Sequence, residues 1–291
     1  MKIGCPIIVW LIVALLLNTC NIINPEEDLP AIIEIPEVSL KTNENQGANT
    51  SNITSVWITV NNQFLGAYPL PAQIPILENG PATIKVEGGI RDNGISSTPE
   101  VYPLWGIIEE NVELGRGNTI LLKPEFSYLN QVKFTMIEDF EGGSLFFNTP
   151  RVGAGFEISG DTVLSGAGSG RIVVTEDQPV AEVFTARRFQ ALQSLSPFVY
   201  LEMDYLAEVP VVFGVIGYEN IGDANGTIVF EPGFFPNEEW NKIYFNFSPV
   251  LAENNFAEVQ FIFRAFIPTE GDFAQQKMAR VWLDNIKLVH F

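Results

Sequence analysis

Few residues of this 291-residue chain could do nucleophilic or acid–base chemistry. His290 is the only histidine, so a Ser-His-Asp triad would depend on it, and no Gly-x-Ser-x-Gly sequence is present to expose a serine. Its place beside the C-terminus predicts the end of a strand instead. Glu202 and Asp204, with Glu208 nearby, form the best carboxylate group, but the tryptophans of a glycosidase cleft are missing around them. We therefore expect no enzyme.

A polar face is the second candidate site. Three segments alternate between apolar and polar residues, as half-buried strands do. If the three strands adjoin in one sheet, their polar members share the face turned away from the core, and that mixture of ring, amide and charged groups suits a sugar. The alternative is an ordinary solvated face on which the arginine pairs with a carboxylate. The predicted ligand-binding residues are Glu202, Asp204, Tyr244, Asn246, Gln260 and Arg264.

The N-terminus carries an export signal. Lys2 is followed by an apolar run of 11 residues from Ile7 to Leu17, which is short for a spanning helix and typical of a signal peptide. The run ends at Leu-Asn-Thr-Cys20, which resembles the lipobox of bacterial lipoproteins, although Asn18 is bulkier than the usual residue. The resemblance implies cleavage before Cys20 and covalent lipid on its thiol. Cys5 would be removed, so the mature chain could form no internal disulfide.

The charge and composition of the chain limit the classes of partner that it could bind. The formal charge of −19 argues against nucleic acid, which needs a basic surface to neutralise phosphates. The acidic residues Glu26, Glu27 and Asp28 resemble the export tag of Bacteroidetes surface lipoproteins, and they are equally typical of a solvated tether. We therefore expect a lipid-anchored protein of the outer membrane, exposed at the cell surface. Hydrophobic residues make up 46% of the chain, enough for a large core.

The pattern along the chain is β throughout, and it predicts an all-β protein. Alternating segments at 56–60, 82–86 and 118–122 are separated by turn signals such as Asn61-Asn62. The stretch from Val56 to Gly88 resembles the PEGA-type module of bacterial envelope proteins, which implies a small Ig-like or transthyretin-like sandwich without catalytic residues. The predicted divisions are a signal peptide (1–19), a lipidated tether (20–30), this PEGA-like β-sandwich (31–127) and a larger one (128–291).

The second half has a resemblance of its own. It opens with Asp139-Phe140-Glu141 and closes with Trp282-Leu-Asp-Asn-Ile-Lys-Leu288, and this arrangement resembles the jelly rolls of carbohydrate-binding and galactose-binding-like modules. In many such jelly rolls the first and last strands meet and hold a structural calcium ion. The resemblance implies Asp139, Glu141 and Asp284 as its ligands, and oxygen donors suit that cation. The alternative is that these are edge carboxylates facing solvent or Lys287.

Two functions remain open at this point. The jelly-roll resemblance implies a non-catalytic surface lipoprotein that captures a glycan. The absence of a run of aromatic residues that could form a platform favours an accessory subunit docked on an outer-membrane protein complex.

Overall fold

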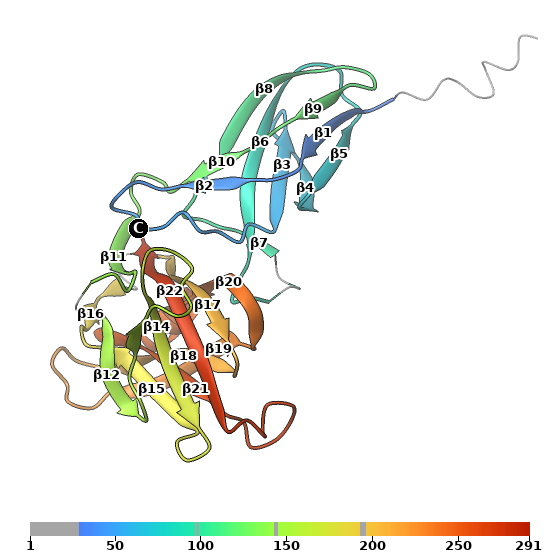
Figure 1. The fold of residues 1–291 in the computed structure, drawn as a ribbon. Coiled ribbons are helices and arrows are strands. Elements are labelled where there is room, and N and C mark those ends of the chain that lie inside the picture. Colours follow the sequence, from blue (N-terminus) through green and yellow to red (C-terminus); the bar gives the residue numbers. More distant parts are fainter. Residues whose placement is uncertain (1–28, 96, 98, 143–144, 193–195) are drawn as a thin grey trace, which may run out of the picture.

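The computed structural model describes residues 29–95, 97, 99–142, 145–192 and 196–291. The predicted signal peptide, Cys20 and most of the tether lie outside these residues. Within them, no helix combines the length and the apolar character needed to cross a bilayer. The predicted all-β fold is confirmed, and Figure 1 shows strands in both halves of the molecule.

Three sheets form the first half. Strands β4, β3, β6 and β7 are hydrogen-bonded in that order, and β8 pairs with β6. The two smaller sheets have the orders β5-β1-β9 and β10-β2, and they include parallel pairs. The strands are β1 (Ala31–Ile35), β2 (Ser39–Lys41), β3 (Ser55–Val60), β4 (Gln63–Pro69), β5 (Ala72–Ile76), β6 (Gly80–Arg91), β7 (Pro99–Val101), β8 (Ile108–Leu114), β9 (Thr119–Leu121) and β10 (Glu125–Ser127).

The turn predicted at Asn61-Asn62 joins β3 to β4. Both asparagines have positive φ angles, 48° and 67°, which a two-residue hairpin turn requires and which asparagine tolerates better than most residues. The alternating residues Val56, Ile58 and Val60 of β3 are fully buried, as the pattern predicts.

The second half is a sandwich of two antiparallel six-stranded sheets. One sheet has the strand order β13-β14-β22-β17-β20, and β11 also pairs with β22; we call it the junction sheet. The other has the order β12-β15-β21-β18-β19, and β16 also pairs with β21; we call it the distal sheet. Helix α4 (Ser248–Asn254) lies between β20 and β21. The strands are β11 (Lys133–Glu138), β12 (Phe147–Val152), β13 (Glu157–Ser159), β14 (Ser169–Thr175), β15 (Val180–Thr185), β16 (Phe189–Gln190), β17 (Val199–Ala207), β18 (Val211–Tyr218), β19 (Thr227–Phe234), β20 (Asn237–Asn246), β21 (Glu258–Phe266) and β22 (Met278–His290).

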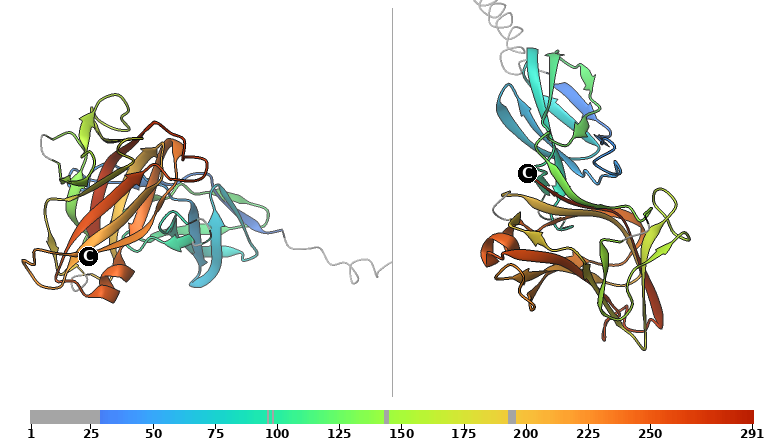
Figure 2. Two further views of the ribbon diagram at one scale, coloured as in Figure 1. Left: turned by 90° about the horizontal axis from the view of Figure 1, so that it is seen from below. Right: turned by 90° about the vertical axis from the view of Figure 1, so that its left-hand side faces the viewer.

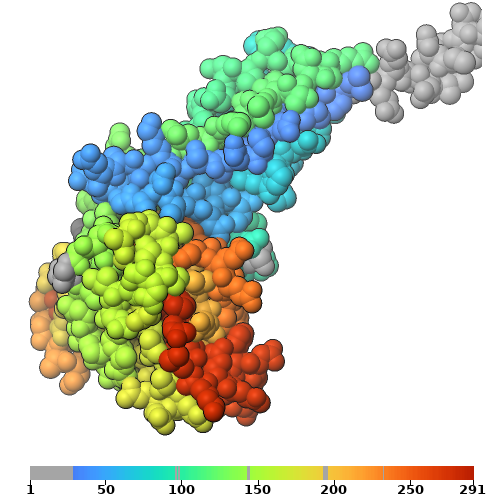
Figure 3. Space-filling view, viewed as in Figure 1, coloured from blue at the N-terminus to red at the C-terminus, as the bar shows by residue number. Residues whose placement is uncertain are grey.

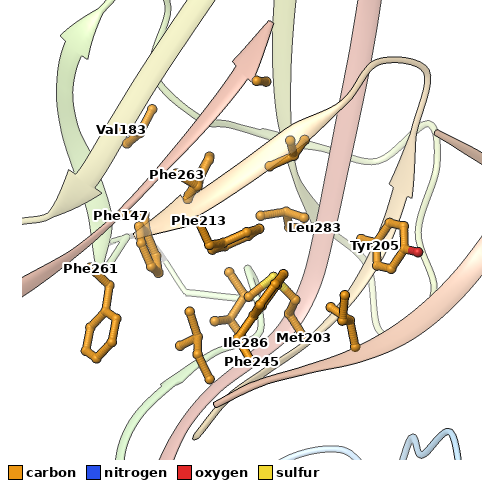
Figure 4. Close-up of a cluster of buried hydrophobic side chains, with 14 of the residues drawn as sticks. Phe147, Val183, Met203, Tyr205, Phe213, Phe245, Phe261, Phe263, Leu283 and Ile286 are labelled. Atoms are coloured by element: carbon orange, nitrogen blue, oxygen red, sulfur yellow. The ribbon is translucent and has the colours of Figure 1, made fainter. Parts of the chain in front are cut away.

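The core between these two sheets is rich in phenylalanine. Phe245 of the junction sheet lies 4.6 Å, between ring centroids, from Phe213 of the distal sheet, and Phe213 lies 5.5 Å from Phe263 (Figure 4). All three side chains are at most 1% exposed. Burying such rings contributes about 1.5–3 kcal/mol each, so this core holds the two sheets together.

The two halves share a second core. Tyr200, Tyr244 and Val289 of the junction sheet pack into the hydrophobic cluster of the first half, beside Tyr102 and Trp105. Figure 2 shows the first half lying against one sheet of the sandwich, and the space-filling view shows no gap along the visible junction (Figure 3). The junction sheet thus packs on the distal sheet with one face and, around Tyr200, Tyr244 and Val289, on the first half with the other, whereas the distal sheet faces away from the first half.

Candidate functional site

The predicted polar face is divided between the two sheets. Strands β17 and β20 pair, so that Glu202 lies opposite Tyr244 as a shared face requires. Strand β21 pairs instead with β15 and β18 of the distal sheet. The prediction that all six residues share one face is therefore wrong for Gln260 and Arg264, because their strand belongs to the opposite sheet.

The first half covers the residues on β17 and β20. Glu202 is 0% exposed, and its carboxylate accepts hydrogen bonds from the hydroxyls of Tyr102 (2.6 Å) and Tyr128 (2.8 Å). The hydroxyl of Tyr244 accepts the backbone N–H of Asn52 at 3.0 Å. A carboxylate enclosed in this way has no route to a substrate or a sugar.

Asp204 and Asn246 also join the two halves. Asp204 is 2% exposed and accepts the hydroxyl of Thr50 at 2.6 Å. The backbone N–H of Asn246 donates to the side chain of Asn93 at 2.9 Å, and its amide donates to Asp92 at 3.3 Å. The four predicted ligand-binding residues of this sheet thus form the polar part of the junction.

Two lysines balance the buried carboxylates of the junction. The ammonium of Lys242 lies 3.6 Å from Asp204 and 3.9 Å from Glu202. Lys287 is 0% exposed and donates to the backbone carbonyl of Ala48. Burial lowers the pKa of Lys287 to about 8, although the nearby Glu202 and Asp204 favour its charged form. Pairing of this kind makes buried charge tolerable.

The predicted calcium ligands do not come together. Asp139 accepts the backbone N–H of Glu141 at 3.1 Å, and Glu141 accepts those of Ala167 (2.7 Å) and Gly168 (3.0 Å). Asp284 accepts the backbone N–H of Ser165 at 3.1 Å. Among the described residues, no group of three or more acidic, histidine or cysteine side chains is placed to hold a metal. Glu141 and Asp284 fix the glycine-rich loop before β14 instead. The first and last strands, β11 and β22, do pair as the resemblance implies.

His290 ends strand β22, as the sequence predicts. It is 3% exposed, and its ring nitrogens lie 2.6 Å from the hydroxyl of Thr135 and 2.6 Å from the carbonyl of Phe291. Both ring nitrogens have hydrogen-bond partners within the protein, which is typical of a histidine with a structural role.

Gln260 and Arg264 lie on the face of the distal sheet that is turned away from the core. We call this face the distal face. Its apolar members form a cluster separate from the two cores, and that cluster consists only of second-half residues: Phe184, Ile216, Tyr218, Ile228, Phe230 and Ile262. Unlike the junction, the distal face is therefore not covered by the first half.

One row of the distal face crosses four strands. The register places Phe184 opposite Ile262, Ile262 opposite Gly214, and Gly214 opposite Phe230. A Cβ atom on Gly214 would lie 3.1 Å from the ring of Phe230 and 2.3 Å from the carbonyl oxygen of Val229. The glycine thus leaves room for the ring. At a strand spacing of about 4.8 Å, the two half-buried rings stand about 14 Å apart.

Two arginines cover aromatic rings on the distal face. The guanidinium of Arg264 lies 4.2 Å from the ring centroid of Phe230, and that of Arg188 lies 3.6 Å from the ring centroid of Tyr218. Arg264 donates to Glu182 at 2.6 Å, as predicted by the alternative in which this arginine pairs with a carboxylate. Cation–π contacts and charge-assisted hydrogen bonds fix an arginine in position.

Carboxylates and an amide complete the polar part of this face. Glu182, 1% exposed, is paired with Arg151 as well as Arg264. Glu258 accepts hydrogen bonds from the backbone N–H of Gly222 (2.9 Å), the amide of Gln190 (2.9 Å) and the guanidinium of Arg188 (3.0 Å), and these hydrogen bonds lower the pKa of Glu258.

Gln260 is held from two sides. Its carbonyl accepts the hydroxyl of Tyr218 at 2.6 Å, and its amide donates to the backbone carbonyl of Thr185. The polar groups of the distal face are thus fixed before any ligand arrives.

A hollow of about 530 Å³ adjoins the distal face on the side of Arg264. Val180 and Phe266, which pair across β15 and β21, line it together with Pro268 and Glu270 from the loop that follows. The hollow combines an apolar wall with the guanidinium of Arg264, as the row of rings does, so the distal face and the hollow form one surface.

Sequence reasoning missed three of these residues. Phe184, Tyr218 and Phe230 have no predicted face, although Phe184 and Phe230 alternate with Val183 and Val229, which pack in the core. That alternation was the available signal, but it could not show which strands adjoin.

Several solved structures resemble this chain. They include the CBM22-2 xylan-binding domain of Xyn10C from Paenibacillus barcinonensis (14% identity, covering 54% of this chain and 99% of that chain, TM-score 0.40). Others are the family 30 carbohydrate-binding module of Clostridium thermocellum cellulase Cel9D-Cel44B (13%, 53% and 96%, TM-score 0.38) and a carbohydrate-binding module of the β-sandwich superfamily (11%, 91% and 99%, TM-score 0.40). No family model and no curated protein matches the chain.

Proposed function

We propose that the protein is a non-catalytic glycan-binding module and that the distal face, with its adjoining hollow, is the binding surface. The observation that carries this proposal is the row from Phe184 to Phe230, uncovered by the first half and flanked by Arg188 and Arg264. Aromatic rings bind the apolar face of a sugar, and planar polar groups bind its hydroxyls. Because these side chains are already fixed by one another, binding costs little ordering.

The same surface argues against catalysis there. Glu182 and Glu258 are each paired with an arginine and nearly enclosed, at 1% and 5% exposure. A glycosidase acid needs a raised pKa, whereas the pKa of Glu258 is lowered by its hydrogen bonds.

Titration calorimetry against a panel of soluble polysaccharides tests the proposal. Phe230→Ala and Arg264→Ala should each weaken binding at least tenfold for a polysaccharide that binds the wild-type protein. The matched controls are Phe64→Ala, an exposed ring of the first half, and Arg171→Ala, an ion-paired arginine of the junction sheet, and both should bind as wild type. Binding to no polysaccharide, or equal loss in the controls, would refute the proposal.

We further propose that the mature chain is held at the outer membrane by lipid on Cys20. The sequence from Lys2 to Cys20 supports this, and the acidic residues after it support exposure at the cell surface. The alternative partner, an outer-membrane protein complex, would be recovered by affinity purification from envelope extracts.

A further inference from the structure

A second hollow, of about 840 Å³, lies on the junction sheet at the part of its outer side that the first half leaves open. Trp282 of β22 and Leu206 of β17 lie directly opposite each other and line it. Phe273, half-buried, lines it from the loop between β21 and β22, which projects at the lower end of the sandwich in Figure 1. The hollow therefore has an aromatic and aliphatic floor, on the opposite sheet from the distal face.

Two polar atoms in the walls of this hollow lack partners. Trp282 is 7% exposed, and its buried indole N–H has no acceptor among the described residues. The amide of Gln276 donates to the carbonyl of Glu208 at 3.1 Å, which fixes its orientation, and its buried oxygen then has no donor in the same part of the chain. Buried polar groups without partners are rare, because each gives up its hydration without replacement. Ligand hydroxyls can partner either atom, since a hydroxyl accepts from an N–H and donates to a carbonyl oxygen.

The charge of the hollow narrows the ligand. Glu208, Glu238 and Glu239 line it, and no lysine or arginine is among its lining residues. Arg280, just outside, is paired with Glu208 at 3.7 Å, whereas Glu238 and Glu239 are exposed. A negative hollow with aromatic walls favours a ligand that carries hydroxyls and a positive charge, and it repels carboxylates and sulfates.

We propose that this hollow is a second sugar site, separate from the distal face, and that it takes an amino sugar. The ring packs on Phe273, ligand hydroxyls partner the indole N–H and the Gln276 oxygen, and the ammonium group lies beside Glu238 and Glu239. The unpaired Trp282 and Gln276 atoms, rather than the acidic cluster alone, carry this assignment.

The test is an NMR titration of the uniformly ¹⁵N-labelled full chain in detergent micelles with the glucosamine tetramer. The indole signal of Trp282, assigned through Trp282→Phe, should shift saturably. Glu238→Gln with Glu239→Gln should weaken binding at least fivefold, and these exposed side chains leave the fold intact. The matched control, Glu109→Gln with Glu110→Gln on β8, also replaces two adjacent exposed glutamates and should not change the affinity.

Two further arms separate this site from the distal face. Phe230→Ala should leave the titration unchanged, and the galacturonate tetramer should not shift the Trp282 signal. An unshifted indole signal, equal affinity for the galacturonate tetramer, or loss of binding in Phe230→Ala would each overturn the second site. The last result would still be compatible with a single site on the distal face, so the two proposals fail separately.

Discussion

The hydroxyl of Tyr102 donates a 2.6 Å hydrogen bond to the carboxylate of Glu202, and the two residues belong to different halves of the chain. Tyr128 donates to the same carboxylate from the end of the first half. Burial and the adjacent Glu202 raise the pKa of Tyr102 well above its ordinary value, so the hydroxyl stays protonated and remains a donor. The two halves are thus joined by directed polar bonds inside a shared apolar core.

Tyr102→Phe should lower the free energy of unfolding by about 1.5–3 kcal/mol, the usual contribution of a hydrogen bond to a charged group. Urea denaturation followed by circular dichroism measures this change. Tyr68→Phe is the control, because the Tyr68 hydroxyl makes no hydrogen bond with the residues that the structure describes. Equal stability of the two variants would show that the bond to Glu202 contributes nothing.

Lys287 should make stability rise in mildly alkaline solution. Its folded pKa is about 8 against 10.5 for the free side chain, so the folded state loses this proton first. Unfolding then takes up a proton between about pH 8 and 10.5, and the free energy of unfolding gains up to about 3 kcal/mol over that range.

The comparison that isolates this effect is wild type minus Lys287→Met, because other groups at the junction titrate too. The buried Tyr102, Tyr128 and Tyr244 have raised pKa values and act in the opposite direction above pH 10. A difference that stays flat from pH 8 to 10 would contradict the lowered pKa.

Asp284 should make the stability of the protein depend on pH in acidic solution. Burial raises its folded pKa from 3.8 to about 6, so the folded state holds the proton more tightly than the unfolded state. Stability from this group is therefore full below pH 3.8 and falls as the pH rises to about 6, by about 3 kcal/mol at most. Asp284→Asn should remove that slope while its amide oxygen still accepts from Ser165. Thermal denaturation of both proteins at pH 4, 5, 6 and 7 measures this slope, and an equal slope in the variant and the wild type would disprove the prediction.

Gly214→Ala should displace Phe230 and destabilise the sandwich by about 1–3 kcal/mol, because the added Cβ meets the backbone oxygen of Val229 at 2.3 Å. Polysaccharide binding at the distal face should weaken with it. Gly142→Ala is the control, since a Cβ there meets nothing within 4 Å. Calorimetry on both variants separates them, and unchanged binding in Gly214→Ala would remove Phe230 from the site.

Cys20→Ser should abolish lipid attachment and release the protein from membranes. Incorporation of labelled palmitate, together with fractionation of cells, measures both effects. Cys5→Ser changes the other cysteine, which precedes the predicted cleavage position, and should leave both results as in wild type. Labelling that survives in Cys20→Ser would place the lipid elsewhere.

The local sequence pattern predicted the individual strands and a turn, but it did not predict how the strands assemble into sheets. Alternation identified which residues of β17, β20 and β21 point away from the core, and Asn61-Asn62 identified a hairpin. It could not show that β21 pairs with β18 rather than β17, because strand neighbours depend on contacts distant in sequence. Nor could it show that Glu202 and Asp204 are buried, since a polar residue covered by another sheet has the same spacing as one facing water.

The covered junction sheet has a mechanical consequence. With charges paired at Lys242 and rings interlocked around Tyr102, the first half cannot swing freely against the sandwich. Strand β1 begins at the end of the first half far from the sandwich, whereas the distal face is on the opposite side of the molecule (Figures 1 and 2). If the chain is tethered before β1 and binds a polymer at the distal face, as proposed, the described part of the molecule would act as a stiff spacer that holds the polymer away from the anchoring surface.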